Sequence, residues 1–141
     1  YSNISVLDIA ESALNRAKLR HAENADAITW IVSDVTEFKP KTSYDVWHDR
    51  AAFHFLTSEE EIQKYLKVME SAIKPNGFLI LGTFSENGPT KCSGIEIKQY
   101  SKEQLKAIIP KSFKFIEGKN VDHPTPSGGL QNFTFCKFQK L

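Results

Sequence analysis

The strongest constraint on the fold is the alternation of short apolar runs with amphipathic helical patterns. Four runs that are rich in β-branched or aromatic residues predict strands at residues 4–7, 28–32, 44–47 and 78–81. Apolar residues at helical spacing predict a helix around residues 10–17 and another around residues 62–73. Strands that alternate with helices indicate an α/β fold, with a mostly parallel sheet and helices on both faces.

Local signals place the ends of several elements. Ser58 with Glu61, and Ser101 with Gln104, have the spacing of a capping box, so a helix is expected to begin after each serine. The segment 74–77, with its proline and glycine, is expected to end the first of these helices. Residues 85–99 read as a long polar loop. Two final strands, starting near residue 113 and at residue 131, are joined by the turn 123–129 and are expected to pair antiparallel.

The composition is that of an ordinary globular protein. The chain has 141 residues, 40% of them hydrophobic, and a net charge of +1, so we expect a single domain over residues 1–141. The balanced charge predicts no nucleic-acid partner, and the absence of a long apolar run predicts no membrane segment. The distant Cys92 and Cys136 read as reduced thiols, which favours a cytoplasmic location. No feature predicts the oligomeric state.

The first three predicted strands all run into acidic residues. Asp8 follows the first, Asp34 the second, and His48, Asp49 and Arg50 the third. One alternative is structural, because aspartate commonly caps a nearby turn or helix. The functional alternative is a ligand site, since ligands of open α/β sheets lie beyond the carboxyl ends of the strands. A carboxylate can accept both hydroxyls of a ribose, and an acid beside an apolar residue suits an adenine.

In this order and spacing, the chain resembles the class I S-adenosylmethionine-dependent methyltransferases, a Rossmann-like family, from the family's second strand onward. The segments that carry this resemblance are VLDIA, IVSDV, YDVWHDR and KPNGFLI. Asn76 and Ile73 depart from the family's usual pattern. The resemblance implies S-adenosyl-L-methionine as cofactor. We expect a small molecule as methyl acceptor, with a protein side chain as the less favoured alternative. The resemblance also implies cofactor contacts, carried over to these positions: Asp8, Ile9, Asp34, Val35, His48, Asp49 and Arg50.

One departure concerns the start of the chain. The family's first strand and its glycine-rich loop, which holds the carboxypropyl end of the cofactor, would precede Tyr1. We therefore expect an N-terminally incomplete domain with a strand missing from its sheet and with weakened cofactor binding. Gly128 and Gly129 do not replace the loop, because a strand rather than a helix follows them.

The remaining candidates are residues for the acceptor side. His54 is a candidate general base, because the ordinary pKa of histidine suits proton transfer at neutral pH. The alternative for His54 is a hydrogen bond to the backbone, and for Arg50 it is an ion pair with Asp34 or Asp45. His48 and His54 have no cysteine or glutamate at ligand spacing, so no metal is expected. Weaker candidates for acceptor contacts are Phe84, Cys92, His123 and Gln131.

Two other functions remain open on the sequence. The first is a non-catalytic or inactive fragment of the same fold. The second is a domain that binds NAD, since an acid after the second strand also holds a ribose there. The antiparallel pair at the C-terminus and the Asp34–Val35 pair argue against the NAD alternative.

Overall fold

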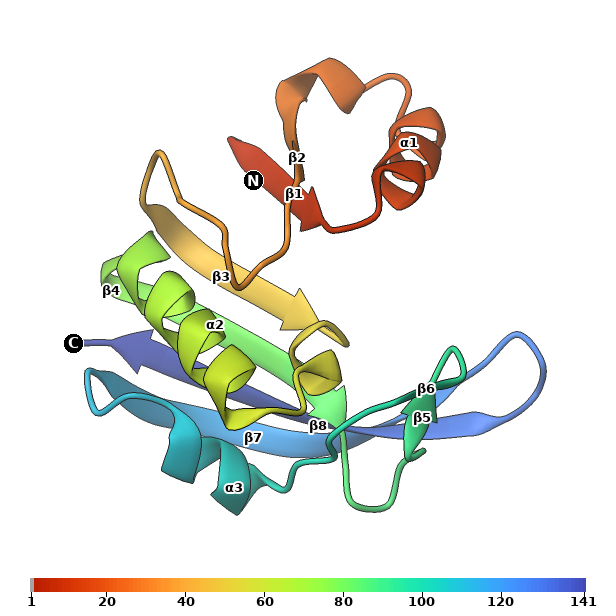
Figure 1. The fold of residues 1–141 in the computed structure, drawn as a ribbon, viewed down its shortest axis with the longest axis vertical. Helices are drawn as coiled ribbons and strands as arrows, with labels where there is room; N and C mark the ends of the chain where they lie inside the picture. The colour runs from red at the N-terminus through yellow and green to blue at the C-terminus, as the bar shows by residue number, and fades with distance from the viewer. Residues whose placement is uncertain (1) are drawn as a thin grey trace. The chain divides into compact units, whose positions relative to one another are not determined.

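The structure is a computed structural model that describes residues 2–141. The chain divides into two compact units, Tyr1–Lys39 and Pro40–Leu141, here called unit 1 and unit 2. Figure 1 draws unit 1 in red and orange and unit 2 in yellow to blue. Each unit has a sheet of its own.

Unit 1 is a parallel strand pair with one crossover helix. Strand β1 (Ile4–Asp8) pairs in parallel with β2 (Ile28–Val32), so that Asp8 lies opposite Val32. Helix α1 (Glu11–Arg20) connects them and buries Leu14, and the short helix η1 (Ala25–Ala27) leads into β2. A parallel pair needs a crossover of this kind. The predicted strands and helix of this region are confirmed.

Unit 2 is built on a four-stranded sheet in the order β3-β4-β8-β7. Its strands are β3 (Tyr44–Arg50), β4 (Ile73–Phe84), β7 (Phe113–Pro124) and β8 (Leu130–Lys140). Only β3 and β4 pair in parallel, so the expectation of a mostly parallel sheet is wrong for this unit. The turn between β7 and β8 is too short for a crossover, and the predicted antiparallel pairing of these two strands is confirmed. Strand β8 lies between β4 and β7 and is also antiparallel to β4.

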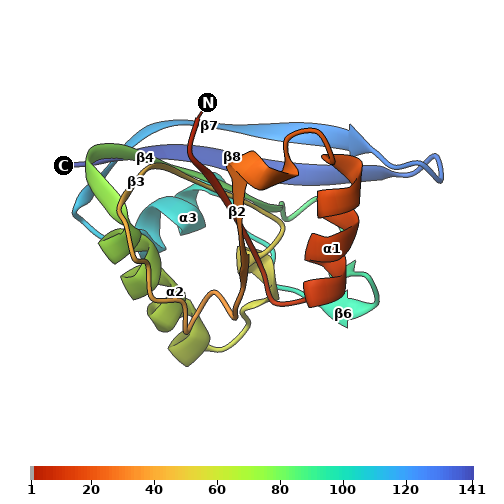
Figure 2. The ribbon, with the colours of Figure 1, turned by 90° about the horizontal axis from the view of Figure 1, so that it is seen from above.

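Two helices cover one face of this sheet (Figures 1 and 2), so within unit 2 the expected coverage of both faces is not found. Helix α2 (Glu59–Ala72) joins β3 to β4, and α3 (Lys102–Ile108) precedes β7. Both start with the predicted capping box, each cap contributing about 1 kcal/mol. The core between helices and sheet consists of side chains with almost no exposed surface, among them Tyr65, Met69, Leu79, Leu81 and Leu105.

Several element ends differ from the sequence prediction. Strand β4 begins directly after α2, and its left-handed residue is Asn76, with φ of 64°, rather than Gly77. The predicted loop 85–99 contains a small hairpin of β5 (Lys91–Cys92) and β6 (Ile95–Glu96). Within residues 2–141, no helix is long and apolar enough to cross a membrane.

Candidate functional site

The carboxyl edge of the unit 1 sheet carries the first two predicted acids. Asp8 Oδ1 accepts a hydrogen bond from the Ala10 amide at 2.8 Å, and Asp34 Oδ1 accepts from the amide and the hydroxyl of Thr36, both at 2.8 Å. The Ser33 amide donates to the Asp8 carbonyl at 3.1 Å, which holds the two turns at one edge. Among residues 2–141, neither Oδ2 has a hydrogen-bond donor. Each acid thus shapes its own turn and keeps one oxygen available.

The apolar partners of these acids lie at the same edge. Ile9 follows Asp8 with 69% of its surface exposed. Val35 follows Asp34 and is half-buried. The structure therefore brings Asp8, Ile9, Asp34 and Val35 together within unit 1.

The third predicted group, His48, Asp49 and Arg50, lies inside β3 rather than beyond it. Side chains alternate between the two faces of a strand. His48 and Arg50 are exposed, whereas Asp49 is buried at 6% exposure. The three residues are adjacent in sequence but do not point to one place.

Asp49 is held by three donors inside unit 2. Its Oδ1 accepts from the amides of Ala52 at 3.0 Å and Phe53 at 3.3 Å, and its Oδ2 accepts from the Tyr65 hydroxyl at 2.7 Å. The Tyr65 oxygen in turn accepts from the Trp47 indole at 3.1 Å. Burial raises the pKa of Asp49, and these hydrogen bonds oppose that shift. This environment gives Asp49 an internal role, and its contact with a cofactor stays a prediction.

Arg50 makes a cation–π contact in place of the ion pair expected from the sequence. Its guanidinium carbon lies 5.1 Å from the centre of the Phe133 ring. Asp45 pairs instead with Lys74, at 2.9 Å. Within unit 2 Arg50 has no ion-pair partner, so the expected pairing with Asp45 is not seen, and the pairing with Asp34 of unit 1 stays a prediction.

His54 lies in a single helical turn, η2 (Phe53–Phe55), and none of its surface is exposed. Its Nδ1 accepts from the Phe84 amide at 3.3 Å, so the backbone-bonded alternative is realised. Burial lowers the pKa of His54 to about 4, and the imidazole is neutral at neutral pH. Within residues 2–141, Nε2 has no hydrogen-bond partner.

A row of rings connects several acceptor candidates. The Phe84 ring centre lies 4.7 Å from that of His54 and 4.9 Å from that of Phe133, and the His123 ring is 6.2 Å from Phe133. Gln131 lies opposite His123 in the β7–β8 ladder. We call His54, Phe84, Phe133 and His123 the ring row. Phe133, which is 2% exposed, links this row and was not among the site residues expected from the sequence.

Cys92 stands apart from this group. It lies in β5, half-buried, and among the described residues no recorded interaction joins its side chain to the ring row. The structure thus brings together Phe84, His123 and Gln131 but not Cys92.

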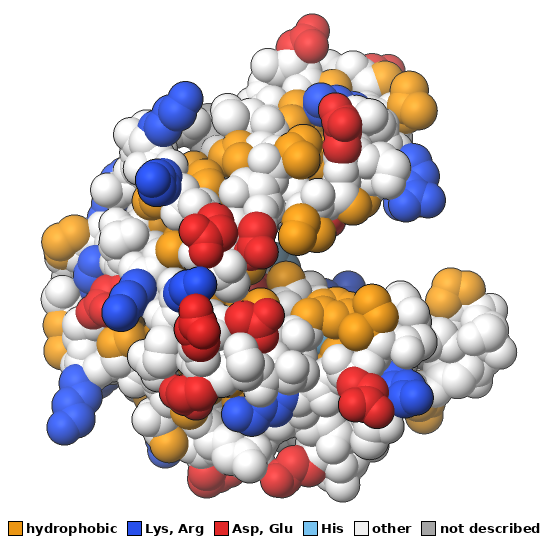
Figure 3. Space-filling view, in the orientation of Figure 1, with side chains coloured by type: hydrophobic (Ala, Val, Ile, Leu, Met, Phe, Trp, Pro, Cys, Tyr) orange, Lys and Arg blue, Asp and Glu red, His pale blue; other side chains and the backbone are white. Residues whose placement is uncertain are grey.

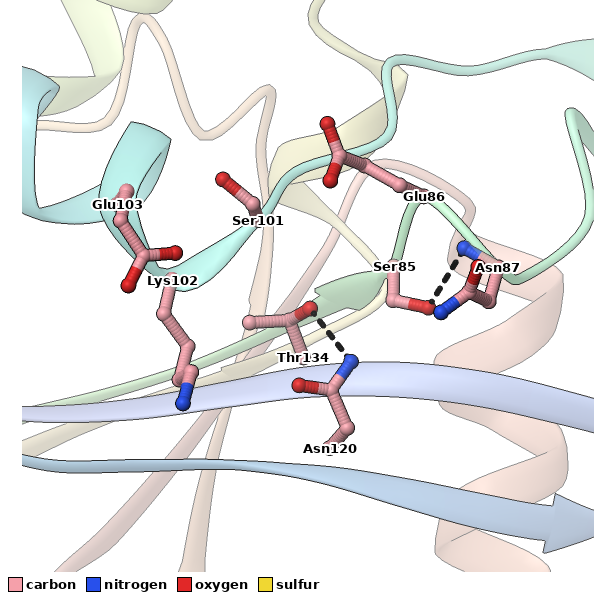
Figure 4. Close-up of a pocket in the computed structure, with 8 residues that line it drawn as sticks. All are labelled: Ser85, Glu86, Asn87, Ser101, Lys102, Glu103, Asn120 and Thr134. Carbon is pink, nitrogen blue, oxygen red and sulfur yellow. Dashed lines mark hydrogen bonds between the residues drawn. The ribbon is translucent and has the colours of Figure 1, made fainter.

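A polar cavity of about 220 Å³ lies where β4 ends, close to the start of α3 (Figure 4). Ser85 accepts from the Asn87 amide and donates to Asn132, while Thr134 accepts from the Asn120 side chain. None of the residues that line the cavity was predicted as a site residue from the sequence. They are Ser85, Glu86, Asn87, Ser101, Lys102, Glu103, Asn120 and Thr134. The only sequence signal was the polar run that starts at Ser85.

The surface of unit 2 shows no concentration of one charge in the view of Figure 3, where acidic and basic side chains are interspersed over α2 and α3. Glu60 and Lys64 form one such pair on α2, at 3.0 Å. Among the described residues, no three side chains of the His, Cys, Asp or Glu types gather as metal ligands.

Comparison with known proteins identifies a curated relative of this chain. A curated relative, the ubiquinone biosynthesis O-methyltransferase of Rickettsia canadensis (strain McKiel), is 26% identical over 133 residues, which are 92% of this chain and 53% of that protein. The chain thus spans about half the length of this relative.

Solved structures share the fold at low sequence identity. The N-methyltransferase NodS from Bradyrhizobium japonicum WM9, in complex with S-adenosyl-L-homocysteine, has a TM-score of 0.75 at 15% identity, over 98% of this chain and 66% of that one. The 1,6-didemethyltoxoflavin-N1-methyltransferase from Burkholderia thailandensis has a TM-score of 0.70 at 18% identity, over 98% and 61%. These likenesses establish a Rossmann-like methyltransferase fold.

A family described as "Methyltransferase domain" matches residues 1–79, more than half of the chain. The match includes Asp8 and Asp34 of unit 1 and the whole of β3. The chain belongs to this methyltransferase family.

Proposed function

We propose that the protein transfers a methyl group from S-adenosyl-L-methionine to a small-molecule acceptor. The observation that carries the proposal is the family match over residues 1–79, which contains the acids at the ends of β1 and β2. The match crosses the boundary between the two units, which supports one methyltransferase domain over residues 1–141.

The cofactor's nucleoside fits the carboxyl edge of unit 1. Asp8 Oδ2 is available to accept the ribose hydroxyls, while Oδ1 keeps the turn in shape through Ala10. Asp34 is available for the adenine amino group, and the exposed Ile9 offers an apolar surface to the ring face, with Val35 as a second apolar contact. For the methionine part we propose His48 and Arg50, which are exposed on β3.

The bound cofactor would supply a methyl group on a sulfonium, which is already activated for in-line transfer. The chain's own residues then need to bind, orient and exclude water, and proximity alone accounts for much of the rate. Two relatives act on small molecules by their names, the ubiquinone biosynthesis enzyme and the didemethyltoxoflavin enzyme. This supports a small-molecule acceptor, with Phe84, His123 and Gln131 of unit 2 as candidate contacts.

The test is calorimetric titration of S-adenosylhomocysteine into the protein. Asp8→Asn is the informative variant, because the asparagine oxygen still accepts from Ala10 while the charge on the ribose side is lost. We expect a loss of affinity of roughly tenfold or more, the size of a charged hydrogen bond. Asp26→Asn, an exposed acid in η1 of the same unit, is the matched control.

Three outcomes would change the proposal. A folded protein that binds no S-adenosylhomocysteine contradicts it. Preference for NADH in the same titration would restore the dinucleotide alternative. Binding without methyl transfer to any acceptor in a broad small-molecule screen would favour a non-catalytic module of the same fold.

A further inference from the structure

The imidazole of His54 is fixed in one orientation by neighbouring strands and loops. The Phe84 amide donates to Nδ1 at 3.3 Å, and the Lys98 amide donates to the His54 carbonyl at 2.8 Å. The ring also lies between Phe84 and Phe55, with centre distances of 4.7 and 4.9 Å. Since Nδ1 accepts a hydrogen bond, the proton of the neutral imidazole is on Nε2.

This Nε2–H group is a buried donor without an acceptor. No surface of His54 is exposed, and within residues 2–141 Nε2 has no hydrogen-bond partner. A buried donor left unpaired costs about 1–3 kcal/mol. Native proteins rarely keep such a group without a reason, and one reason is a ligand that completes the hydrogen bond.

The turn that carries His54 is held from a second side. Asp49 accepts from the amides of Ala52 and Phe53, and the Ala51 amide donates to the Gly82 carbonyl at 2.9 Å. Ala51 has φ of 64°, a left-handed conformation that costs a non-glycine residue about 1 kcal/mol or more. A turn so constrained sets the direction of the Nε2–H bond before any ligand binds.

We propose that His54 is a hydrogen-bond donor to the methyl acceptor, through Nε2–H, and not the base that takes the acceptor's proton. This inference rests on the proposed function. The lone pair that a base would need is on Nδ1, where the Phe84 amide already occupies it. The bond orients the acceptor through an oxygen next to the atom that is methylated, because donation to the reacting atom itself would weaken it as a nucleophile.

The surroundings of Nε2 indicate the kind of acceptor. The neighbouring rings of Phe55 and Phe84 are apolar, and the Nε2–H group of His54 is an unpaired polar donor beside them. This combination suits a flat ring that bears an oxygen. Phe55 is half-buried whereas Phe84 is 1% exposed, so of the two rings Phe55 is the one that solvent reaches.

The first test needs no ligand. Nitrogen-15 NMR of the imidazole in the free protein is expected to show a protonated Nε2 and an unprotonated Nδ1. It is also expected to show no uptake of a second proton between pH 7 and about 5, because burial lowers the pKa of His54. A proton found on Nδ1 overturns the proposal directly.

The second test compares phenol with toluene, which differ by a hydroxyl in place of a methyl, at saturating S-adenosylhomocysteine. Phenol is expected to shift the Nε2–H resonance and toluene is not. His54→Gln keeps a donor near the position of Nε2, whereas His54→Asn keeps only the acceptor for the Phe84 amide. We expect His54→Asn to lose roughly tenfold in phenol affinity and His54→Gln to lose much less.

The outcomes separate this inference from the proposed function. If S-adenosylhomocysteine binds but phenol and toluene act alike, or if the two variants weaken phenol equally, the donor role is wrong and the methyltransferase proposal stands. If S-adenosylhomocysteine does not bind the folded protein, both fail.

Discussion

Asp8 and Asp34 in unit 1 differ sharply from Asp49 in unit 2, although all three come from the same sequence pattern, an acid where a strand leaves the core. In unit 1 each acid uses one oxygen for an amide two residues ahead and keeps the other available. In unit 2 both oxygens of Asp49 are bound, one of them to Tyr65, sixteen residues away.

The comparison teaches that an acid at a strand end keeps an oxygen available for a ligand when all of its partners in the protein are local. A local turn uses one oxygen and leaves the side chain near solvent. A distant partner such as Tyr65 draws the carboxylate into the core, where three donors compensate for the loss of water. Four predictions test this difference, in order of decreasing effect.

The largest effect is expected from Asp49→Ala. It leaves the Tyr65 hydroxyl and two buried amides without an acceptor, so the free energy of unfolding of unit 2 falls by about 3 kcal/mol or more. Asp8→Ala removes one hydrogen bond, from the Ala10 amide, and should lower the free energy of unfolding by about 1 kcal/mol. Urea unfolding, followed by Trp47 fluorescence in a Trp30→Phe background, measures unit 2, and circular dichroism measures the Asp8 variant. Equal losses of unfolding free energy for Asp49→Ala and Asp8→Ala would show that the buried and the exposed acid contribute alike to stability.

The second prediction concerns pH and His54. Its folded pKa of about 4 lies below the ordinary 6.5, so the unfolded state binds the extra proton, and stability falls as pH drops from 6.5 toward 4. His54→Phe should remove about 2 kcal/mol of this pH dependence between pH 6.5 and 4.5, with Asp49 present in both proteins. If the free energies of unfolding of the unaltered protein and of His54→Phe change in parallel with pH, His54 is not buried as a neutral group.

The third prediction uses a matched pair of tyrosines. Tyr65→Phe removes the hydroxyl that donates to Asp49 Oδ2 and accepts from the Trp47 indole, and we expect a cost of about 1–2 kcal/mol. Tyr100→Phe removes a buried hydroxyl that has no hydrogen-bond partner among residues 2–141, and should be neutral or stabilising.

The cost of Tyr65→Phe should also grow with pH. Loss of the Tyr65 hydrogen bond raises the folded pKa of Asp49 further above its unfolded value, so stability is lost as pH rises through that pKa. Chemical unfolding of both tyrosine variants at pH 4 and pH 7 checks the sign. A cost that is equal at both pH values would mean that the buried carboxyl of Asp49 does not ionise between pH 4 and pH 7.

The smallest effect is expected at Asp45, four residues before Asp49 on the same strand. Its carboxylate pairs with Lys74 at the surface, where both side chains are exposed. Exposed pairs contribute little, so Asp45→Ala should change the unfolding free energy by less than about 0.5 kcal/mol. A cost close to that of Asp49→Ala would show that position on β3, rather than burial, determines the effect.

Much of the fold was predictable because it depends on neighbours in sequence. The capping boxes at Ser58 and Ser101 involve residues three apart, and the strands of unit 1 follow runs of apolar residues. The β5–β6 hairpin was missed because its strands have two residues each and carry no periodic pattern. Whether the neighbour of β4 is β7 or β8 depends on where β8 inserts in the sheet, which no local pattern encodes.

The sequence by itself determined the alternation of strands and helices, the methyltransferase family and the acids at the ends of β1 and β2, because these follow from short-range spacing. The tertiary structure alone decided that Asp49 turns inward to Tyr65 and that the Phe84 amide occupies His54 Nδ1. Both contacts join residues that are distant in the chain, and their strength comes from burial, which exists only once the sheet and its helices have packed.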